Sequence, residues 1–265
     1  MNDLISKTAE EIFGIKADPS DVEKLRAHIT GKYGGENPEN IKKAFMSGEA
    51  AGFLTVNETY FFREPVHFDF LLNLLPAFEK TGLRICSAAT STGCEAYSIV
   101  MLLEAYNKGR ALPLPYHIDA FDIDQLAIKT AVEGIYGERS MREDGSSLRY
   151  MTLPYVKRLE CGYQVDSSLK KNINFFVYNL MDALSPESYH IIFFRNAFIY
   201  LSHRARSRIL SNLSCALKEG GILIMGVSET AGASHETLEE KNENEVFYFQ
   251  KTLMASTSCS TFPIP

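Results

Sequence analysis

The hydrophobic pattern of the chain changes near residue 55. Before that point, apolar residues recur at helical spacing, first on a face formed by Leu4, Ile5, Ala9, Ile12 and Phe13. After residue 65, short apolar runs alternate with helical segments. Strands that alternate with helices are typical of a parallel sheet with both faces covered. We therefore expect an N-terminal helical domain over 1–55 and an α/β domain over 56–265.

Local start signals support the helices of the N-terminal region. Ser20 and Glu23 have the spacing of a capping box, which predicts a helix that starts at Ser20. Asn37 directly before Pro38 predicts the start of another helix, because asparagine caps helices well and proline is favoured in the first turn.

The α/β region contains several apolar runs that read as buried strands. These runs lie at 83–88, 116–123, 189–194, 222–227 and 245–251. The segments between them predict helices at 94–106, 125–134 and 203–221. From 135 to 188 the alternation is interrupted. There CGYQVDSS and KNINFFVYN alternate like two antiparallel strands, so we expect an inserted β subdomain over about 148–178.

Composition narrows the class of protein. The formal net charge is -6, which does not favour nucleic acid as a partner, because phosphate binding needs a basic face. No apolar run reaches the roughly 18–20 residues of a membrane span. The five cysteines are scattered and form no CxxC pair, which argues against a disulfide framework and a zinc site. We expect a cytoplasmic monomer with no metal and no membrane insertion.

The first strand of the sheet runs into the loop SAATSTGCEAYS. Small residues such as Ala88 and Gly93 allow a ligand to approach the backbone, and Glu95 begins the next helix. A dinucleotide site would need GxGxxG here. A single glycine and a carboxylate instead favour a nucleoside that lacks phosphates and bears a positive group, as S-adenosylmethionine does. A plain turn, with Glu95 as a favourable first-turn acid, explains the loop about as well.

Polar residues also follow the next two strands. Asp122 lies at the end of the second strand, where an acid commonly accepts the ribose hydroxyls, and Asp124 is better placed to cap a helix. Arg195 and Asn196 end the third strand, and Tyr200 follows one helical turn later. Because ligands bind beyond the carboxyl ends of strands in α/β sheets, we expect these groups to share one site.

Five segments together resemble the CheR family, the S-adenosylmethionine-dependent methyltransferases that esterify glutamates on chemotaxis receptors. The segments are NETYFFRE, SAATSTGCEAYSI, FDIDQLAI with GIY, FFRNAFIYL and GGILIMGVSE, in this order. The resemblance implies a small helical N-terminal domain, a Rossmann-like class I methyltransferase sheet and an inserted β subdomain. It also implies S-adenosylmethionine as cofactor, S-adenosylhomocysteine as product and the cytoplasmic region of chemoreceptors, or a related signalling protein, as partner.

The resemblance assigns roles to particular residues. It implies that Tyr200 points toward the methyl group and that Arg63 contacts the cofactor and acts in catalysis. The full set of implied or inferred cofactor contacts is Thr59, Arg63, Ala88, Gly93, Glu95, Asp122, Asn179, Leu180, Arg195 and Asn196. Whether Arg63 or Arg195 holds the substrate is left open. We expect Phe61 and Phe62, in the aromatic run of NETYFFRE, to be interface core.

The chain also departs from the family pattern. Cys94 stands where members usually carry an acid, Ala96 replaces a usual proline, and GVSET replaces a form with histidine. The N-terminal region has seven Lys and Arg against nine Asp and Glu, whereas members that bind receptor helices present a basic helix there. Lys32, Lys42 and Lys43 are candidates for a local basic patch.

Two other functions fit the sequence: a class I methyltransferase that acts on a small hydroxylated molecule, and a cofactor-binding signalling module without catalysis. A glutamate acceptor needs no general base, since a free glutamate with a pKa of about 4.3 is ionised in the cell. Some CheR enzymes grip a receptor peptide with the β subdomain. Only VKRLE lies between Tyr155 and CGYQV here, so we expect no dependence on such a peptide.

Overall fold

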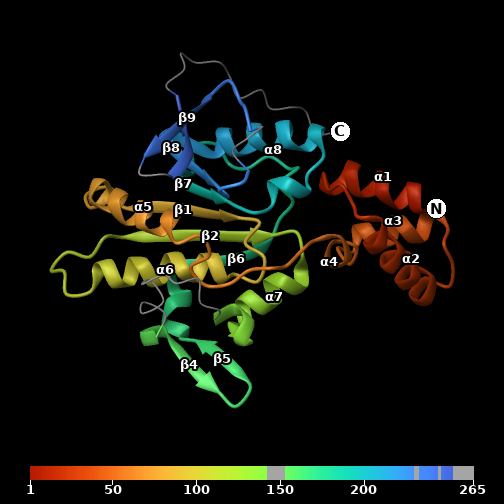
Figure 1. Ribbon diagram of the computed structural model, residues 1–265, viewed down its shortest axis with the longest axis horizontal. Helices are drawn as coiled ribbons and strands as arrows, with labels where there is room; N and C mark the ends of the chain where they lie inside the picture. Colours follow the sequence, from red (N-terminus) through yellow and green to blue (C-terminus); the bar gives the residue numbers. More distant parts are fainter. Residues whose placement is uncertain (142–152, 230–232, 244–245, 253–265) are drawn as a thin grey trace.

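The computed structural model describes residues 1–141, 153–229, 233–243 and 246–252. The N-terminal region consists of four helices: α1 (Asn2–Phe13), α2 (Pro19–Tyr33), α3 (Pro38–Met46) and α4 (Ala51–Leu54). They pack around an apolar cluster of their own, beside the large sheet (Figure 1). The division into domains at residue 55 stays a prediction, although the separate cluster agrees with it.

Two details of the N-terminal region differ from the sequence pattern. Asp18, not Ser20, caps α2, because the Asp18 carboxylate accepts the backbone N–H of Ser20 at 2.8 Å and Pro19 opens the helix. Leu4 is exposed, although it was predicted to face inward. The prediction for α3 is confirmed, since the Asn37 side chain accepts the N–H of Asn40 at 2.9 Å.

The main sheet has seven strands in the order β6-β2-β1-β7-β8-β10-β9. Their bounds are β1 (Leu83–Ala88), β2 (Tyr116–Asp122), β6 (Ile173–Val177), β7 (Tyr189–Phe194), β8 (Leu217–Met225), β9 (Leu238–Glu243) and β10 (Val246–Lys251). The first five in the order run parallel, and β10 is antiparallel to both of its neighbours. The prediction of a mainly parallel, Rossmann-like sheet is confirmed.

Helices cover both faces of this sheet. On one face, α5 (Val66–Leu74) and α6 (Cys94–Asn107) bury Phe68, Tyr97 and Met101 against it. On the other, α8 (His203–Ala216) buries Ile209 and Leu213. The remaining helix, α7 (Gln125–Glu133), contacts β2, β6 and α4. Short 3₁₀ helices complete the described elements: η1 (Leu75–Phe78), η2 (Glu138–Met141), η4 (Leu153–Tyr155), η5 (Ser167–Asn172) and η6 (Phe198–Tyr200).

The prediction of a helix over 203–221 was too long. The helix α8 ends at Ala216, and Leu217–Met225 is the strand β8. Helical periodicity continues into LKEGG by chance, but β8 pairs with both β7 and β10, and this pairing decides the conformation. Strand β9 was missed because LEEKNE is polar and lies at the edge of the sheet, where no hydrophobic pattern is required.

The inserted sheet is smaller than expected, and it is built from other residues. It has the order β3-β5-β4, from Ile135–Tyr136, Gly162–Val165 and Val156–Leu159. The predicted pairing of KNINFFVYN with CGYQV is wrong, because β6 pairs in parallel with β2 in the main sheet. The first four residues of VKRLE form strand β4 (Val156–Leu159) and are not a short approach, which removes the reason for expecting independence from a receptor peptide. Residues 142–152 lie outside the described part.

In the part of the chain that the structure describes, no helix is both long and apolar enough to cross a membrane.

Candidate functional site

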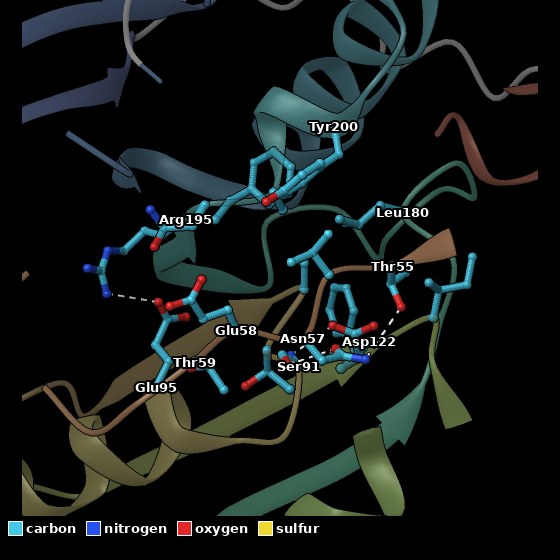
Figure 2. Close-up of a pocket in the computed structure, with 18 of the residues that line it drawn as sticks. Thr55, Asn57, Glu58, Thr59, Ser91, Glu95, Asp122, Leu180, Arg195 and Tyr200 are labelled. Atoms are coloured by element: carbon cyan, nitrogen blue, oxygen red, sulfur yellow. Dashed lines mark hydrogen bonds and ion pairs between the residues drawn. The ribbon is translucent and has the colours of Figure 1, made fainter. Parts of the chain in front are cut away.

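A pocket lies at the carboxyl ends of β1, β2 and β7. It encloses about 1040 Å³, open mouth included, and is lined by the loops after these strands and after β6. The linker over 54–63 and residues from α1 close the opposite side. This is the position at which ligands bind in open α/β sheets. The predicted strand-end residues Asp122, Arg195 and Asn196 all line the same pocket. Figure 2 shows Asp122 and Arg195 in it.

One end of the pocket, which we call the ribose end, is built around Asp122. This carboxylate is 6% exposed, and its two oxygens accept the backbone N–H groups of Ser91 at 2.8 Å and of Asp124 at 3.0 Å. Burial raises the pKa of Asp122, and the two N–H groups act in the opposite direction. Each oxygen has a further lone pair, so the carboxylate can also accept two hydroxyl groups of a ligand.

Asn57 connects the linker to the ribose end. Its side-chain oxygen accepts the hydroxyl of Ser91 at 2.8 Å, and its amide donates to Asp124 at 2.7 Å. Asp124 in turn caps α7, as predicted, by accepting the N–H groups of Leu126 and Ala127. The sequence interpretation missed Asn57, although its place at the start of NETYFFRE was a usable signal.

The N-terminal region forms part of the pocket wall. Phe13 and Ile15 line the pocket, together with Leu180. The side-chain amide of Asn179 donates to the carbonyl of Ile12 at 2.7 Å, so it ties this wall to the loop after β6. Sequence patterns gave no sign of this contact, because the N-terminal and sheet segments are far apart in the chain.

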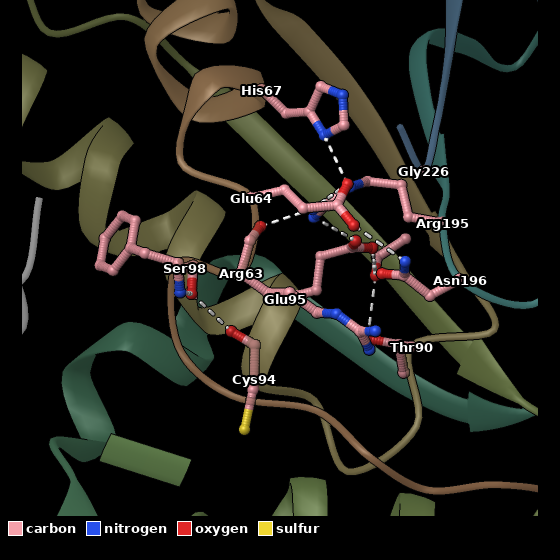
Figure 3. A network of polar contacts seen from close by, with 12 residues as sticks. Arg63, Glu64, His67, Thr90, Cys94, Glu95, Ser98, Arg195, Asn196 and Gly226 are labelled. Carbon is pink, nitrogen blue, oxygen red and sulfur yellow. Dashed lines mark hydrogen bonds and ion pairs between the residues drawn. The ribbon is translucent and has the colours of Figure 1, made fainter. Parts of the chain in front are cut away.

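The other end of the pocket, which we call the charged end, is centred on Arg195. The side chain of Arg195 is 2% exposed and lies between two carboxylates, Glu95 at 3.0 Å and Glu64 at 3.2 Å (Figure 3). It also donates to the carbonyl of Arg63. The second oxygen of Glu95 accepts the hydroxyl of Ser87 at 2.7 Å. The ion pairs and the hydrogen bond of Arg195 thus join three segments of the chain: the linker, helix α6 and the end of β7.

Burial and Arg195 set the protonation states at the charged end. Burial raises the pKa of Glu95, and the Arg195 guanidinium opposes this rise. Burial also acts to raise the pKa of Glu64, but Arg195 and Asn196 outweigh it and the pKa is lowered. For His67, burial and then Arg195 lower the pKa to about 3, so the imidazole is neutral near pH 7.

The two arginines of the pocket therefore differ. Arg195 is neutralised by carboxylates within the protein. Arg63 has no carboxylate partner among the described residues; it donates to the carbonyl of Glu58 at 2.7 Å and lies over the ring of Tyr60 at 5.8 Å. Because Arg63 also lines the pocket, it is the arginine available to a ligand carboxylate.

A buried carboxylate holds the loop that carries Tyr200. Glu229 is 2% exposed and accepts the N–H groups of Asn196 at 2.5 Å, Gly226 at 3.0 Å and Ile199 at 3.3 Å. These bonds fix the turn η6, at whose end Tyr200 stands in the pocket lining, 37% exposed. The sequence interpretation treated GVSET only as a departure from a family pattern and missed the role of Glu229.

Phe61 and Phe62 of the linker face the core, as expected, whereas Tyr60 lines the pocket. Phe61 and Phe62 are buried in the cluster beneath α5 and α6, and the N–H of Phe62 donates to Ser98 at 2.9 Å. Phe62 and Glu64 have φ of 54° and 56°, a conformation that side chains other than glycine rarely adopt. This backbone directs Phe62 inward and leaves Arg63 on the pocket side.

Most of the predicted contacts line the pocket, and two do not. Those in the lining are Thr59, Arg63, Glu95, Asp122, Asn179, Leu180, Arg195, Asn196 and Tyr200. Ala88 is fully buried in the core, and its neighbour Ala89 lines the pocket instead. Gly93 precedes α6 with φ of 85°, and a Cβ there would lie 2.7 Å from the Cβ of Ala131. Packing against α7 is thus sufficient to explain this glycine, and its contact with the cofactor stays a prediction.

Among the described residues, no cluster of three or more His, Cys, Asp or Glu side chains could hold a metal ion.

Known proteins similar to this chain are methyltransferases. The family described as "CheR methyltransferase, SAM binding domain" matches residues 57–247. A chemotaxis protein methyltransferase of Borreliella burgdorferi is 36% identical over 188 residues, which cover 67% of this chain and 65% of that protein. One of Vibrio parahaemolyticus is 33% identical over 186 residues, or 68% of this chain and 67% of that protein.

A third relative is named for another role. The "Probable biofilm formation methyltransferase WspC" of Pseudomonas aeruginosa is 32% identical over 209 residues, which cover 75% of this chain and 48% of that protein. The chain therefore spans about two thirds of the length of the first two relatives and about half of the third.

Proposed function

The chain belongs to the CheR methyltransferase family, and on that premise we propose that it transfers a methyl group from S-adenosylmethionine to glutamate carboxylates. The acceptor is the cytoplasmic region of a chemoreceptor or of a related signalling protein, which places the enzyme in the cytoplasm. The relatives named as chemotaxis protein methyltransferases support a chemoreceptor as the acceptor. Because another relative is named for biofilm formation, we include related signalling proteins among the acceptors.

The chemistry of the pocket lining carries this proposal. S-adenosylmethionine has an adenine, a ribose diol and an amino acid end, and the pocket offers a matching group for each. Apolar residues such as Phe13, Ile15 and Leu180 suit the adenine, and the buried carboxylate of Asp122 suits the diol. Glu95 and Arg63 suit the ammonium and carboxylate of the amino acid end. The residues present therefore fit this cofactor.

A dinucleotide fits the same lining poorly. Three carboxylates, Glu58, Glu95 and Asp122, line the pocket, and the charge of Arg195 is already balanced by Glu64 and Glu95. A pyrophosphate beside Glu95 and Asp122 would therefore be repelled, and among the described lining residues Arg63 is the cation left to offset this repulsion. A cationic sulfonium is favoured by the same arrangement.

When bound, S-adenosylmethionine supplies an electrophilic methyl group on its sulfonium, which an oxygen nucleophile can displace. The chain's task is to bind and align. A glutamate acceptor is already ionised, so no described residue is required to remove a proton. Proximity and alignment can supply roughly 7–11 kcal/mol of a barrier. Tyr200, held at the pocket by Glu229 through the η6 turn, orients the reacting groups.

The test is methyl transfer from radiolabelled S-adenosylmethionine to a purified chemoreceptor cytoplasmic fragment. The proposal predicts label that is released as methanol by mild base, as a carboxyl methyl ester requires. It also predicts no label in a fragment whose acceptor glutamates are replaced by glutamine. Base-stable label, or transfer only to small molecules, would overturn the proposed acceptor.

A further inference from the structure

Helix α8 begins with a charge pattern that local physics does not favour. Arg204, Arg206 and Arg208 lie in its first two turns, and the whole helix contains no Asp or Glu. The start of a helix carries partial positive charge, which disfavours cations there. Arg204 and Arg208 are also four residues apart, so two like charges lie on the same face of the helix. In a chain with a formal net charge of -6, this concentration of arginine calls for a functional explanation.

The three arginines do not have the same role. Arg206 donates to the carbonyl of Ile199 at 3.4 Å and covers the ring of Phe198 at 4.8 Å, so it supports the turn before α8. Arg204 and Arg208 are exposed, and neither forms an ion pair with a described residue. Their charge is therefore available to a partner.

These two arginines are close in the chain to residues that line the pocket, since Arg204 follows Tyr200 and Leu201 and Arg208 directly precedes Ile209. Tyr200 lines the pocket and lies at the end of η6, just before the start of α8 that carries Arg204. Lys16, also exposed and without a described ion pair, donates its backbone N–H to the carbonyl of Tyr200 at 2.8 Å. Gly14 packs against Ala205, which brings the end of α1 against the start of α8 (Figure 1). We call Lys16, Arg204 and Arg208 the α8 basic patch.

Most basic residues of α2 and α3 differ from Lys16, because they pair with acids of the same region. On α2, Lys24 pairs with Asp21 at 2.7 Å, and Lys32 pairs with Glu49 at 2.5 Å. On α3, Lys43 pairs with Glu39 at 3.3 Å. The candidate patch of Lys32, Lys42 and Lys43 is thus largely neutralised from within. Exposed pairs of this kind contribute little to stability, but they reduce the positive field that an acidic partner would meet.

We propose that the α8 basic patch is the docking surface for an acidic segment of the substrate protein, next to the glutamate that is methylated. This inference rests on the proposed function, because the acceptor there is itself a carboxylate. A segment with further acidic residues near the acceptor has the complementary charge. Docking beside Tyr200 brings the acceptor to the mouth of the pocket.

The experiment separates docking from chemistry. Binding is measured by fluorescence anisotropy with a labelled peptide that carries several glutamates, in the presence of S-adenosylhomocysteine. A peptide with glutamine at the same positions is the ligand control. The test variant is Arg204→Glu with Arg208→Glu. The matched variant is Lys80→Glu with Lys108→Glu, two exposed lysines without a described ion pair, at the far end of the sheet.

The proposal predicts that the test variant weakens peptide binding about tenfold or more, because two attractive charges become repulsive. The matched variant should leave binding unchanged, and Arg204→Lys with Arg208→Lys should retain most of it. The melting temperature of the test variant should not fall, since acids suit a helix start. If the arginines had only a structural role, the melting temperature of the test variant would fall.

Several outcomes would overturn the proposal: no binding by the native protein, equal binding of the glutamine peptide, or equal losses in the test and matched variants. Methylation is scored separately. If the native protein binds the acidic peptide through the patch but forms no methyl ester on any carboxylate substrate, the proposed function fails and the docking surface stands.

Discussion

The ribose end and the charged end of the pocket both use buried carboxylates, but in different ways. At the ribose end, Asp122 is held by backbone N–H groups and keeps lone pairs for a ligand. At the charged end, Glu64 and Glu95 pair with Arg195, and Glu229 accepts three backbone N–H groups; Glu95 also keeps a lone pair on each oxygen for the ammonium of the cofactor. The first arrangement presents an acceptor, whereas the second joins the linker, α6 and the loop after β7.

This difference separates binding from positioning. Changes at the ribose end should weaken the cofactor and leave the fold intact. Changes at the charged end should act on stability or turnover, because its side chains hold other segments in place. Four substitutions, ordered by expected effect, test this contrast.

Arg195→Met should cause the largest loss of stability. The substitution leaves Glu64 and Glu95 buried without their cation, and breaking a buried pair in this way costs about 3–5 kcal/mol. Chemical denaturation measures the loss. Arg63→Ala is the matched control, because Arg63 has no carboxylate partner among the described residues. It should reduce methyl transfer with little change in unfolding. Equal destabilisation by both would contradict the assignment.

Asp122→Ala should weaken S-adenosylhomocysteine binding by about 1.5–3 kcal/mol, the loss expected when a charged acceptor is removed from hydroxyl donors. Calorimetric titration of the folded variant measures it. Asp124→Ala is the control: it removes the cap of α7 and should cost about 1 kcal/mol of stability with a smaller effect on binding. Unchanged affinity in Asp122→Ala would remove the ribose assignment.

The success of the sequence analysis follows a different division, which cuts across both ends of the pocket. Asp122, Glu95 and Arg195 were predicted because strand ends are visible as apolar runs, and such ends converge in a parallel sheet. Asn57 and Glu229 were missed because their partners are backbone groups and side chains distant in sequence. Ala88 was placed one residue too early, since a short strand does not show which residue is the first to leave the sheet.

The inserted sheet shows a second limit. KNINFFVYN has strand character, and this was predicted, but its partner was not. Pairing with β2 extends the buried core, whereas a hairpin with CGYQV would leave Phe175 and Phe176 outside it. Alternation identifies a strand, but the choice of neighbour is a property of the whole sheet.

Glu229→Gln should reduce turnover while S-adenosylhomocysteine affinity is retained. The amide group of glutamine cannot accept all the N–H groups that the carboxylate accepts, and an unsatisfied buried donor costs about 1–2 kcal/mol. Steady-state kinetics should show a lower kcat with a smaller change in KM. Glu219→Gln, at an exposed position on β8, is the control and should have no effect. An unchanged kcat would show that Glu229 does not position the η6 turn.

Glu64→Gln should have the smallest effect, and that effect should depend on pH. The pKa of Glu64 is lowered below its ordinary value of 4.5 in the folded protein. Its ionised form therefore contributes stability above about pH 4.5, and the contribution is lost as pH falls through the folded-state pKa. The variant should be less stable than the native protein by up to about 1 kcal/mol at pH 7. The stabilities of the variant and the native protein should converge as the pH falls through this lowered pKa, and a difference that stays constant with pH would argue against the ion pair.

The most direct test of the account is a crystal structure of the protein with S-adenosylhomocysteine bound. The account predicts that the nucleoside occupies the pocket at the ends of β1, β2 and β7, with its ribose hydroxyls on Asp122. Its amino acid end should lie at Glu95 and Arg63, while Arg195 stays between Glu64 and Glu95. A ligand bound elsewhere, or a ribose without contact to Asp122, would contradict it.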